Sequence, residues 1–134
     1  MSTIRKFEDL EIWKMSRNYS KMIFNLTKKE QFAKDFGLKQ QINNSSGSVM
    51  DNIAEGFGRG GNREFVNFIS IAIGSCTESQ SQLYRALDRE YILQAEFDEC
   101  YAMAEKIIIK SGNFISYLNK SEFKGEKFKN RREV

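Results

Sequence analysis

The stretch Asn52-Ile53-Ala54-Glu55-Gly56-Phe57-Gly58-Arg59, followed closely by Glu64-Phe65, contains the features that decide the fold. Its first half continues a helical pattern, and the glycines at positions 56, 58, 60 and 61 then end that helix. Asn62 is the predicted N-cap of the next helix, because an Asn side chain can accept a hydrogen bond from the unpaired amides there. Residues 52–65 are therefore predicted to hold one helix end, one tight turn and one helix start.

Apolar residues recur at helical spacing on both sides of this turn. The four segments with this spacing are residues 12–26, 36–57, 63–90 and 95–119. Asp35 is a plausible cap for the second segment. Proline is absent, so no residue in the chain forbids a long helix, and no strand alternation appears. We predict an all-α fold, namely an antiparallel up-down-up-down four-helix bundle over residues 1–119.

Two stretches of small residues interrupt the apolar pattern. Residues 43–48 read Asn-Asn-Ser-Ser-Gly-Ser, a run that costs several tenths of a kcal/mol per residue relative to Ala in a helix. Residues 72–81 of the third segment are also mostly small. The first run stays helical only if tertiary packing holds it, and small side chains allow a neighbouring helix to approach closely.

Composition excludes most catalytic sites. The chain of 134 residues has no histidine, which excludes Ser-His-Asp and Cys-His catalysis and Glu-x-x-His di-iron sites. Its two cysteines, Cys76 and Cys100, form no CxxC pair, which argues against a zinc site. Glu55, Glu64 and Glu78 are the remaining candidates for chemistry, although helix-dipole and ion-pair roles are the favoured interpretation. We expect no catalytic residue, no metal and no cofactor.

Charge and apolar width suggest binding surfaces instead. Arg59 and Arg63 flank the glycine turn, and Lys14, Arg17 and Lys21 form a strip on the first helix. These basic residues are candidate phosphate contacts, although helix-surface charges also serve solubility alone. Residues 120–134 form a basic tail with a net charge of +3, either a second phosphate contact or a solubilising segment. The third and fourth helices carry more apolar surface than a monomer needs, which predicts an oligomer interface at Phe68, Ile73, Ile107 and Ile109.

Several pieces of the chain, in order over about residues 7–90, match one known family. They are Phe7-Glu8-Asp9-Leu10, Ile12-Trp13, Phe36-Gly37-Leu38 with Gln41-Ile42, the stretch 52–59, Glu64-Phe65 with Phe68, and Ile71-Ala72-Ile73-Gly74-Ser75 with Glu78, Gln82 and Leu83. The chain thus resembles the small four-helix-bundle family encoded in intervening sequences of bacterial large-subunit ribosomal RNA genes.

This resemblance implies a homopentameric ring of bundles. Relatives of the family include the accessory protein of diversity-generating retroelements, which partners a reverse transcriptase and binds nucleic acid through basic surfaces. The chain departs from the family at two places. It has Asn43-Asn44 where members often carry basic residues, and Met50 where they carry a proline. The first departure removes positive charge, and the second removes a helix kink.

Three functions follow as hypotheses. The leading one is a non-catalytic, pentameric bundle that binds RNA or DNA weakly with little sequence preference, as an accessory to a reverse transcriptase or another nucleic-acid enzyme. The alternative is a protein-directed scaffold or adaptor with no nucleic-acid role. An enzyme would require a carboxylate–metal cluster and tight magnesium or manganese binding. The first residues lack the apolar core of a signal peptide and no apolar run is long enough to span a bilayer, so we expect a cytoplasmic protein without membrane partners.

Overall fold

The computed structural model describes residues 4–121 of the chain, and these residues form helices and connections with no strand among them. The elements are a 3-10 helix η1 (Phe7–Asp9) and the α-helices α1 (Glu11–Leu26), α2 (Glu30–Lys34), α3 (Phe36–Arg59), α4 (Asn62–Asp88) and α5 (Gln94–Ser121). The predicted all-α class is confirmed. The two short elements were not predicted, because fewer than two turns show no periodic pattern. Lys120 and Ser121 end α5, and the rest of the predicted basic tail lies outside the described residues.

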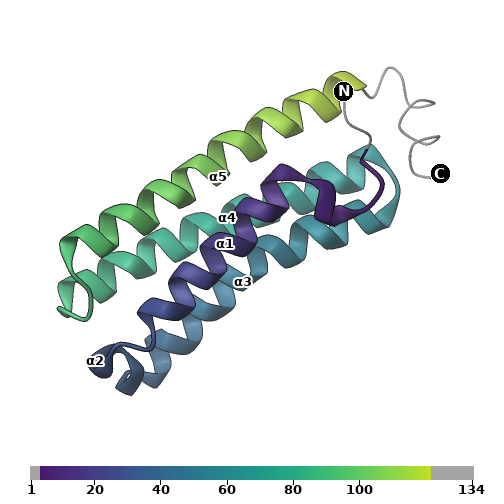
Figure 1. The fold of residues 1–134 in the computed structure, drawn as a ribbon. Helices are drawn as coiled ribbons and strands as arrows, with labels where there is room; N and C mark the ends of the chain where they lie inside the picture. The colour runs from purple at the N-terminus through teal and green to yellow at the C-terminus, as the bar shows by residue number, and fades with distance from the viewer. Residues whose placement is uncertain (1–3, 122–134) are drawn as a thin grey trace.

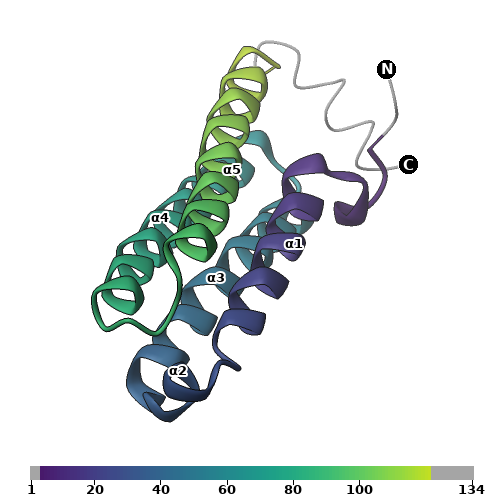
Figure 2. The same cartoon turned by 60° about the vertical axis from the view of Figure 1, so that its left-hand side comes forward.

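The four long helices lie alongside one another, with α2 at one end (Figures 1 and 2). The most extensive contact joins α3 and α4, while α4 also packs on α5, and α1 packs on both α3 and α5. Polar contacts pair the helix ends. Lys29, just after α1, lies 2.6 Å from Glu96 at the start of α5, and Glu11 at the start of α1 lies 3.2 Å from Lys110 in the second half of α5.

All four long helices contribute to one apolar core. Tyr19 of α1 and Leu83 of α4 are fully buried, as are Ile42, Ile53 and Ile69. The Tyr19 hydroxyl lies 2.7 Å from the Ser79 hydroxyl, and Ser79 in turn donates to the carbonyl of Cys76. Because Ser79 has only one proton to donate, Tyr19 is the donor between the two hydroxyls. Burial raises the pKa of the Tyr19 hydroxyl.

The predicted weak run at residues 43–48 is helical throughout, inside the unbroken helix α3. Its serines are held by α4: Ser45 donates to the side chain of Gln82, and the hydroxyls of Ser48 and Ser75 lie 3.0 Å apart. The expectation that tertiary packing stabilises this run is therefore confirmed. Small side chains on both helices allow their backbones to approach closely.

The glycine turn differs in detail from the prediction. Helix α3 continues past Phe57 to Arg59 and ends at Gly60, whose φ of 103° suits only glycine. Gly56 lies inside the helix and is buried against α4. A Cβ at this position would come within 2.6 Å of the Cβ of Phe68. Asn62 is not the N-cap of α4: Gly61 occupies that position, and the Asn62 amide instead donates to the carbonyl of Leu118 at 2.9 Å.

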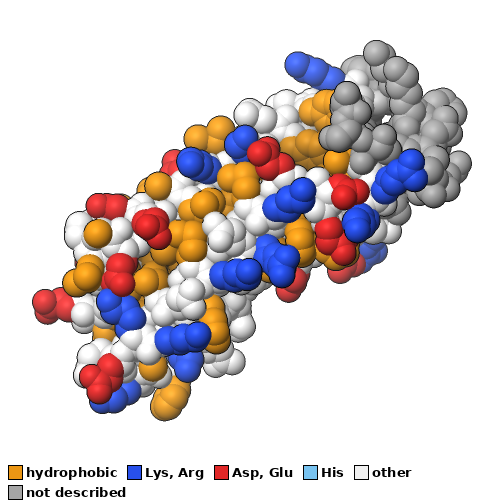
Figure 3. All heavy atoms as spheres, in the orientation of Figure 1, with side chains coloured by type: hydrophobic (Ala, Val, Ile, Leu, Met, Phe, Trp, Pro, Cys, Tyr) orange, Lys and Arg blue, Asp and Glu red, His pale blue; other side chains and the backbone are white. Residues whose placement is uncertain are grey.

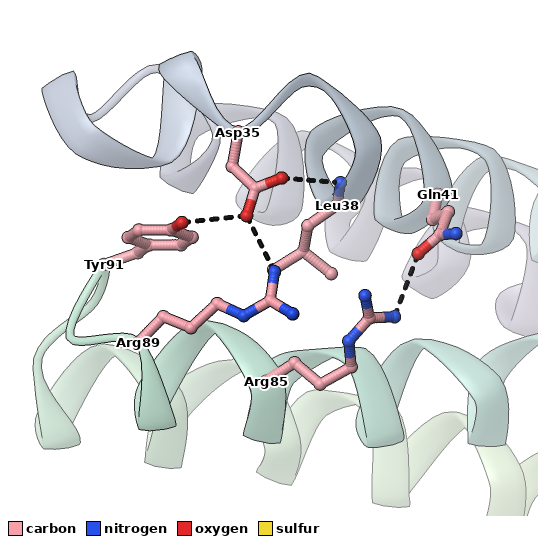
Figure 4. Close-up of polar contacts among 6 residues, drawn as sticks. All are labelled: Asp35, Leu38, Gln41, Arg85, Arg89 and Tyr91. Carbon is pink, nitrogen blue, oxygen red and sulfur yellow. Dashed lines mark hydrogen bonds and ion pairs between the residues drawn. The ribbon is translucent and has the colours of Figure 1, made fainter.

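Asp35 caps α3 as predicted, since its carboxylate accepts a hydrogen bond from the Leu38 amide at 3.2 Å. The same carboxylate ties the start of α3 to the end of α4 (Figure 4). It accepts from the Tyr91 hydroxyl at 2.8 Å and from Arg89 at 2.7 Å, and Arg85 donates to Gln41 one turn further along. The hydrogen bond from Tyr91, followed by those from Leu38 and Arg89, holds the pKa of Asp35 below its ordinary value.

Candidate nucleic-acid interface

The exposed face of α1 concentrates positive charge. Residues 12–29 contain Lys14, Arg17, Lys21, Lys28 and Lys29 and no Asp or Glu, in a chain with 18 acidic residues. Lys29 is paired with Glu96. The other four are exposed and make no ion pair with any described residue. The three residues predicted from sequence therefore lie on one open surface, and Lys28, in the turn just after α1, is a fourth exposed cation.

Figure 3 shows this surface, with Lys and Arg side chains gathered along α1 in the middle of the visible face. The helix periodicity explains the arrangement. Ile12, Tyr19 and Ile23 turn inward and are buried, so the basic residues between them must face solvent. This is the amphipathic pattern of a surface helix, and every charged residue of α1 after Glu11 is basic.

Two aromatic rings lie among these cations. The guanidinium of Arg17 lies 5.9 Å from the centre of the Trp13 ring, and the ammonium of Lys28 lies 4.8 Å from the centre of the Phe24 ring. Both distances fall within the range of a cation–π contact. The sequence-based prediction missed both aromatic residues, although their spacing of four residues from a basic residue was visible in the sequence.

The other predicted basic pair lies elsewhere, at the glycine turn. Arg59 forms a two-nitrogen contact with Glu55 at 2.8 and 3.1 Å, and its guanidinium lies 5.1 Å from the ring centre of Phe68. Arg63 is exposed in the first turn of α4. Since Arg59 is already paired with a carboxylate, it is a weaker candidate for a phosphate contact than the cations of α1.

The residues predicted for an oligomer interface divide into three groups. Ile109 is 59% exposed, and Phe68 and Ile73 are half-buried. The structure corrects the prediction for Ile107, which is 1% exposed and lies in the core. Its side chain offers no surface to a second copy. Three consecutive isoleucines cover more than half the helix circumference, so periodicity alone does not identify the inward one.

The carboxylates singled out from sequence do not converge. Glu55 is paired with Arg59, and Glu64 and Glu78 are exposed on α4, about 21 Å apart along the helix axis. Within residues 4–121, no three Cys, Asp or Glu side chains lie close enough together to hold a metal ion. Both cysteines are buried, and burial raises the pKa of Cys76 to about 12 and that of Cys100 to about 11.

Comparison with known families now places the chain. The family described as 23S rRNA-intervening sequence protein matches residues 8–111, which span η1 through α4 and most of α5. The chain belongs to the 23S rRNA-intervening sequence protein family. The predicted resemblance is thereby confirmed, and the exposed basic face of α1 lies within the matched residues.

One solved structure is similar to this family member over most of its helices. It is a crystal structure of a protein of unknown function from the S23 ribosomal protein family of Bacteroides thetaiotaomicron. The two share 22% sequence identity with a TM-score of 0.72, and the match covers 78% of this chain and 97% of the other. At this identity the likeness concerns the fold. Among curated proteins, none is similar enough to this chain to count as a match.

Two departures from the family pattern can be located in this intervening-sequence protein. Asn43 is half-buried and donates to the hydroxyl of Thr27 at 3.2 Å, so it holds α3 against the end of α1. Asn44 is exposed. Met50 lies in an unbroken helix, as expected without a proline. No helix among residues 4–121 is both long enough and apolar enough to cross a bilayer.

Proposed function

We propose that this chain is a non-catalytic nucleic-acid-binding protein that engages RNA or DNA weakly, with little sequence preference, through the exposed face of α1. The observation that carries the proposal is the acid-free stretch 12–29, whose Lys14, Arg17, Lys21 and Lys28 are exposed and form no ion pair with any described residue. Phosphate binding draws most of its affinity from such cations, because each contact releases a condensed counterion.

The fold proposed with this function is an up-down-up-down bundle that assembles into a cytoplasmic homopentamer. The paired ends of α1 with α5, of α3 with α4 and of α4 with α5 support the antiparallel order. Exposed Ile109 and half-buried Ile73 provide apolar surface for a second copy. A ring would repeat the α1 face five times, so weak contacts would add. Native mass spectrometry tests the assembly: a species of about five times 15.6 kDa supports it, and a monomer refutes it.

The binding proposal is tested by the salt dependence of affinity. The plot of log affinity against log salt has a negative slope, to which each phosphate contact contributes about −0.7 to −0.9. Replacing Lys14, Arg17 and Lys21 together by Gln should therefore make this slope less negative by about 2–3. The matched control replaces Arg5, Lys34 and Lys120 by Gln, which removes the same charge from exposed positions outside α1. An equal effect of both triple variants would show that net charge alone, rather than the α1 face, governs binding.

A second candidate function is a protein-directed scaffold or adaptor with no nucleic-acid role. Large exposed side chains favour it, notably Phe36 at 77% and Leu93 at 64% exposure. Loss of all nucleic-acid binding near physiological salt, in a protein that still assembles, would support the adaptor over the nucleic-acid role.

A further inference from the structure

The face of α1 carries two features that phosphate binding alone does not use, namely the aromatic rings of Trp13 and Phe24. These residues are eleven positions apart, which is about three helical turns, so both rings lie on the same side of the helix. Their separation along the axis is about 16 Å. Arg17 and Lys21 lie between them on the same strip, and Lys28 follows Phe24 one turn later.

Phe24 is unusual among the aromatic residues of α1. It is 51% exposed, whereas Tyr19 on the same helix is fully buried. A half-exposed phenylalanine forgoes part of the stabilisation that full burial of its ring would give. Here its ring lies on the basic face, with the ammonium of Lys28 4.8 Å from the ring centre. The ring is thus about half exposed, and the Lys28 ammonium lies over one of its faces.

Trp13 provides the second ring, which is half-buried because part of the indole packs against the core. The Phe7 ring contacts it edge-on, with ring centres 5.0 Å apart, and this contact holds the indole in place. The Arg17 guanidinium lies 5.9 Å from the indole centre. Indole rings and guanidinium planes are both groups on which unpaired nucleobases stack. Along the chain the order is Trp13, Arg17, Lys21, Phe24 and Lys28, so two cations separate the rings and a third follows them.

We infer that the face of α1 binds single-stranded nucleic acid in preference to duplex, with bases stacked at Trp13 and Phe24 and phosphates held by the cations between them. This inference rests on the proposed nucleic-acid role and specifies its ligand. A duplex keeps its bases stacked on one another and presents only phosphates to a convex helix, so the rings gain nothing from it. Base stacking on an aromatic side chain is independent of sequence, which agrees with binding that has little sequence preference. A separation of about 16 Å corresponds to roughly five stacked nucleotides or fewer extended ones.

The chain provides its own reporter, because Trp13 is the one tryptophan among its 134 residues. Binding of a twelve-nucleotide oligothymidylate should quench its fluorescence, while the duplex of that strand with oligoadenylate should leave the fluorescence nearly unchanged. Anisotropy of the labelled oligonucleotides gives both affinities in the same buffer at low salt.

The decisive variant is Phe24→Leu, with Phe36→Leu as the matched control on an exposed ring outside the α1 face. Loss of one stacking platform is worth about 1–3 kcal/mol, so the affinity of Phe24→Leu for the single strand should fall roughly 5- to 150-fold. Its affinity for the duplex should stay within about twofold, and Phe36→Leu should change neither. Native mass spectrometry of both variants checks that assembly is intact.

The remaining outcomes separate the two levels of inference. If the unaltered protein binds single strand and duplex equally and Phe24→Leu leaves both unchanged, stacking is refuted while phosphate binding by α1 stands. If Phe24→Leu weakens both ligands alike, the ring supports the helix or the assembly rather than a base, and stacking is again refuted. If the unaltered protein binds neither ligand at low salt, the proposed function fails as well.

Discussion

Replacing Gly56 by Ala provides a direct test of how closely α3 and α4 pack. An added Cβ would lie 2.6 Å from the Cβ of Phe68 and 3.1 Å from a ring carbon of Phe65. Carbon atoms pack at about 3.5–4.0 Å, so the closest pair is short by about 1 Å. A Cβ is fixed to its backbone and cannot rotate away, so relief requires the two helices to separate. Overpacking a protein core typically costs about 1–3 kcal/mol, and a clash of this size should destabilise the fold by about 2–3 kcal/mol.

Helix propensity acts in the opposite direction, because Ala in a helix interior is favoured over Gly by about 1 kcal/mol. The net effect of Gly56→Ala is therefore a loss of about 1–2 kcal/mol of unfolding free energy. For a chain of this size that corresponds to a fall in melting temperature of roughly 3–8 °C. Without the clash the same substitution would raise stability, so the sign of the change in unfolding free energy shows whether α3 and α4 pack this closely.

Gly58→Ala is the matched control, two residues further along the same helix. Nothing lies within 4 Å of a Cβ added at Gly58 or at Gly47, so both substitutions should leave stability unchanged or raise it by up to about 1 kcal/mol. Urea unfolding followed by helical circular dichroism, at one protein concentration for all variants, measures the three differences. A Gly56→Ala protein as stable as Gly58→Ala would refute the close approach of α3 and α4.

Three further predictions concern stability and reactivity. Ser79→Ala should cost about 1–3 kcal/mol in urea unfolding because it leaves a buried tyrosine hydroxyl without an acceptor, whereas Ser111→Ala, which removes a buried hydroxyl that lacks a partner in residues 4–121, should be neutral or stabilising. The pKa of Asp35 is lowered from 3.8 in the folded state, so the carboxylate's contribution to stability is present above about pH 4 and is lost as pH falls through the lowered pKa. Asp35→Asn should therefore destabilise the protein at neutral pH and flatten the acid side of its stability–pH profile. An unchanged profile would contradict this role. Cys76 and Cys100 are buried with raised pKa values of about 12 and 11, so at pH 8 a thiol reagent should label the native protein far more slowly than the urea-unfolded one; equal rates would contradict their burial.

The long helices were predictable because their apolar spacing repeats over several turns. The predicted bounds of the second helix, 36–57, differ from those of α3 by two residues at one end, and Asp35 was recognised as its cap. Residues 43–48 have low helix propensity, so the sequence predicted that they stay helical only where another helix packs against them. The Ser45–Gln82 and Ser48–Ser75 contacts supply that partner.

The features that the sequence did not predict depend on where individual side chains point, which the periodicity of apolar residues does not determine. Asn is a common N-cap residue, but Gly61 occupies the N-cap position of α4 and the Asn62 amide instead donates to the carbonyl of Leu118. Ile107 and Ile109 are equally apolar, yet only the backbone phase decides which one is buried. The pairing of Arg59 with Glu55 had a visible signal, since the two are four residues apart on one helix. An ion-pair role was the favoured interpretation for Glu55, and the structure identifies Arg59 as its partner.

The two-residue connection between α3 and α4 also bears on the order in which the chain folds. Gly60 and Gly61 join the two helices that share the most extensive contact, so little chain entropy is lost when they meet. The hairpin of α3 and α4 is thus a local unit, whereas the polar contacts of α1 and the turn after it with α5 join residues 67 and 99 positions apart. Topologies with such local contacts fold quickly. The helix proposed to bind nucleic acid therefore joins a scaffold whose central pair can assemble without it.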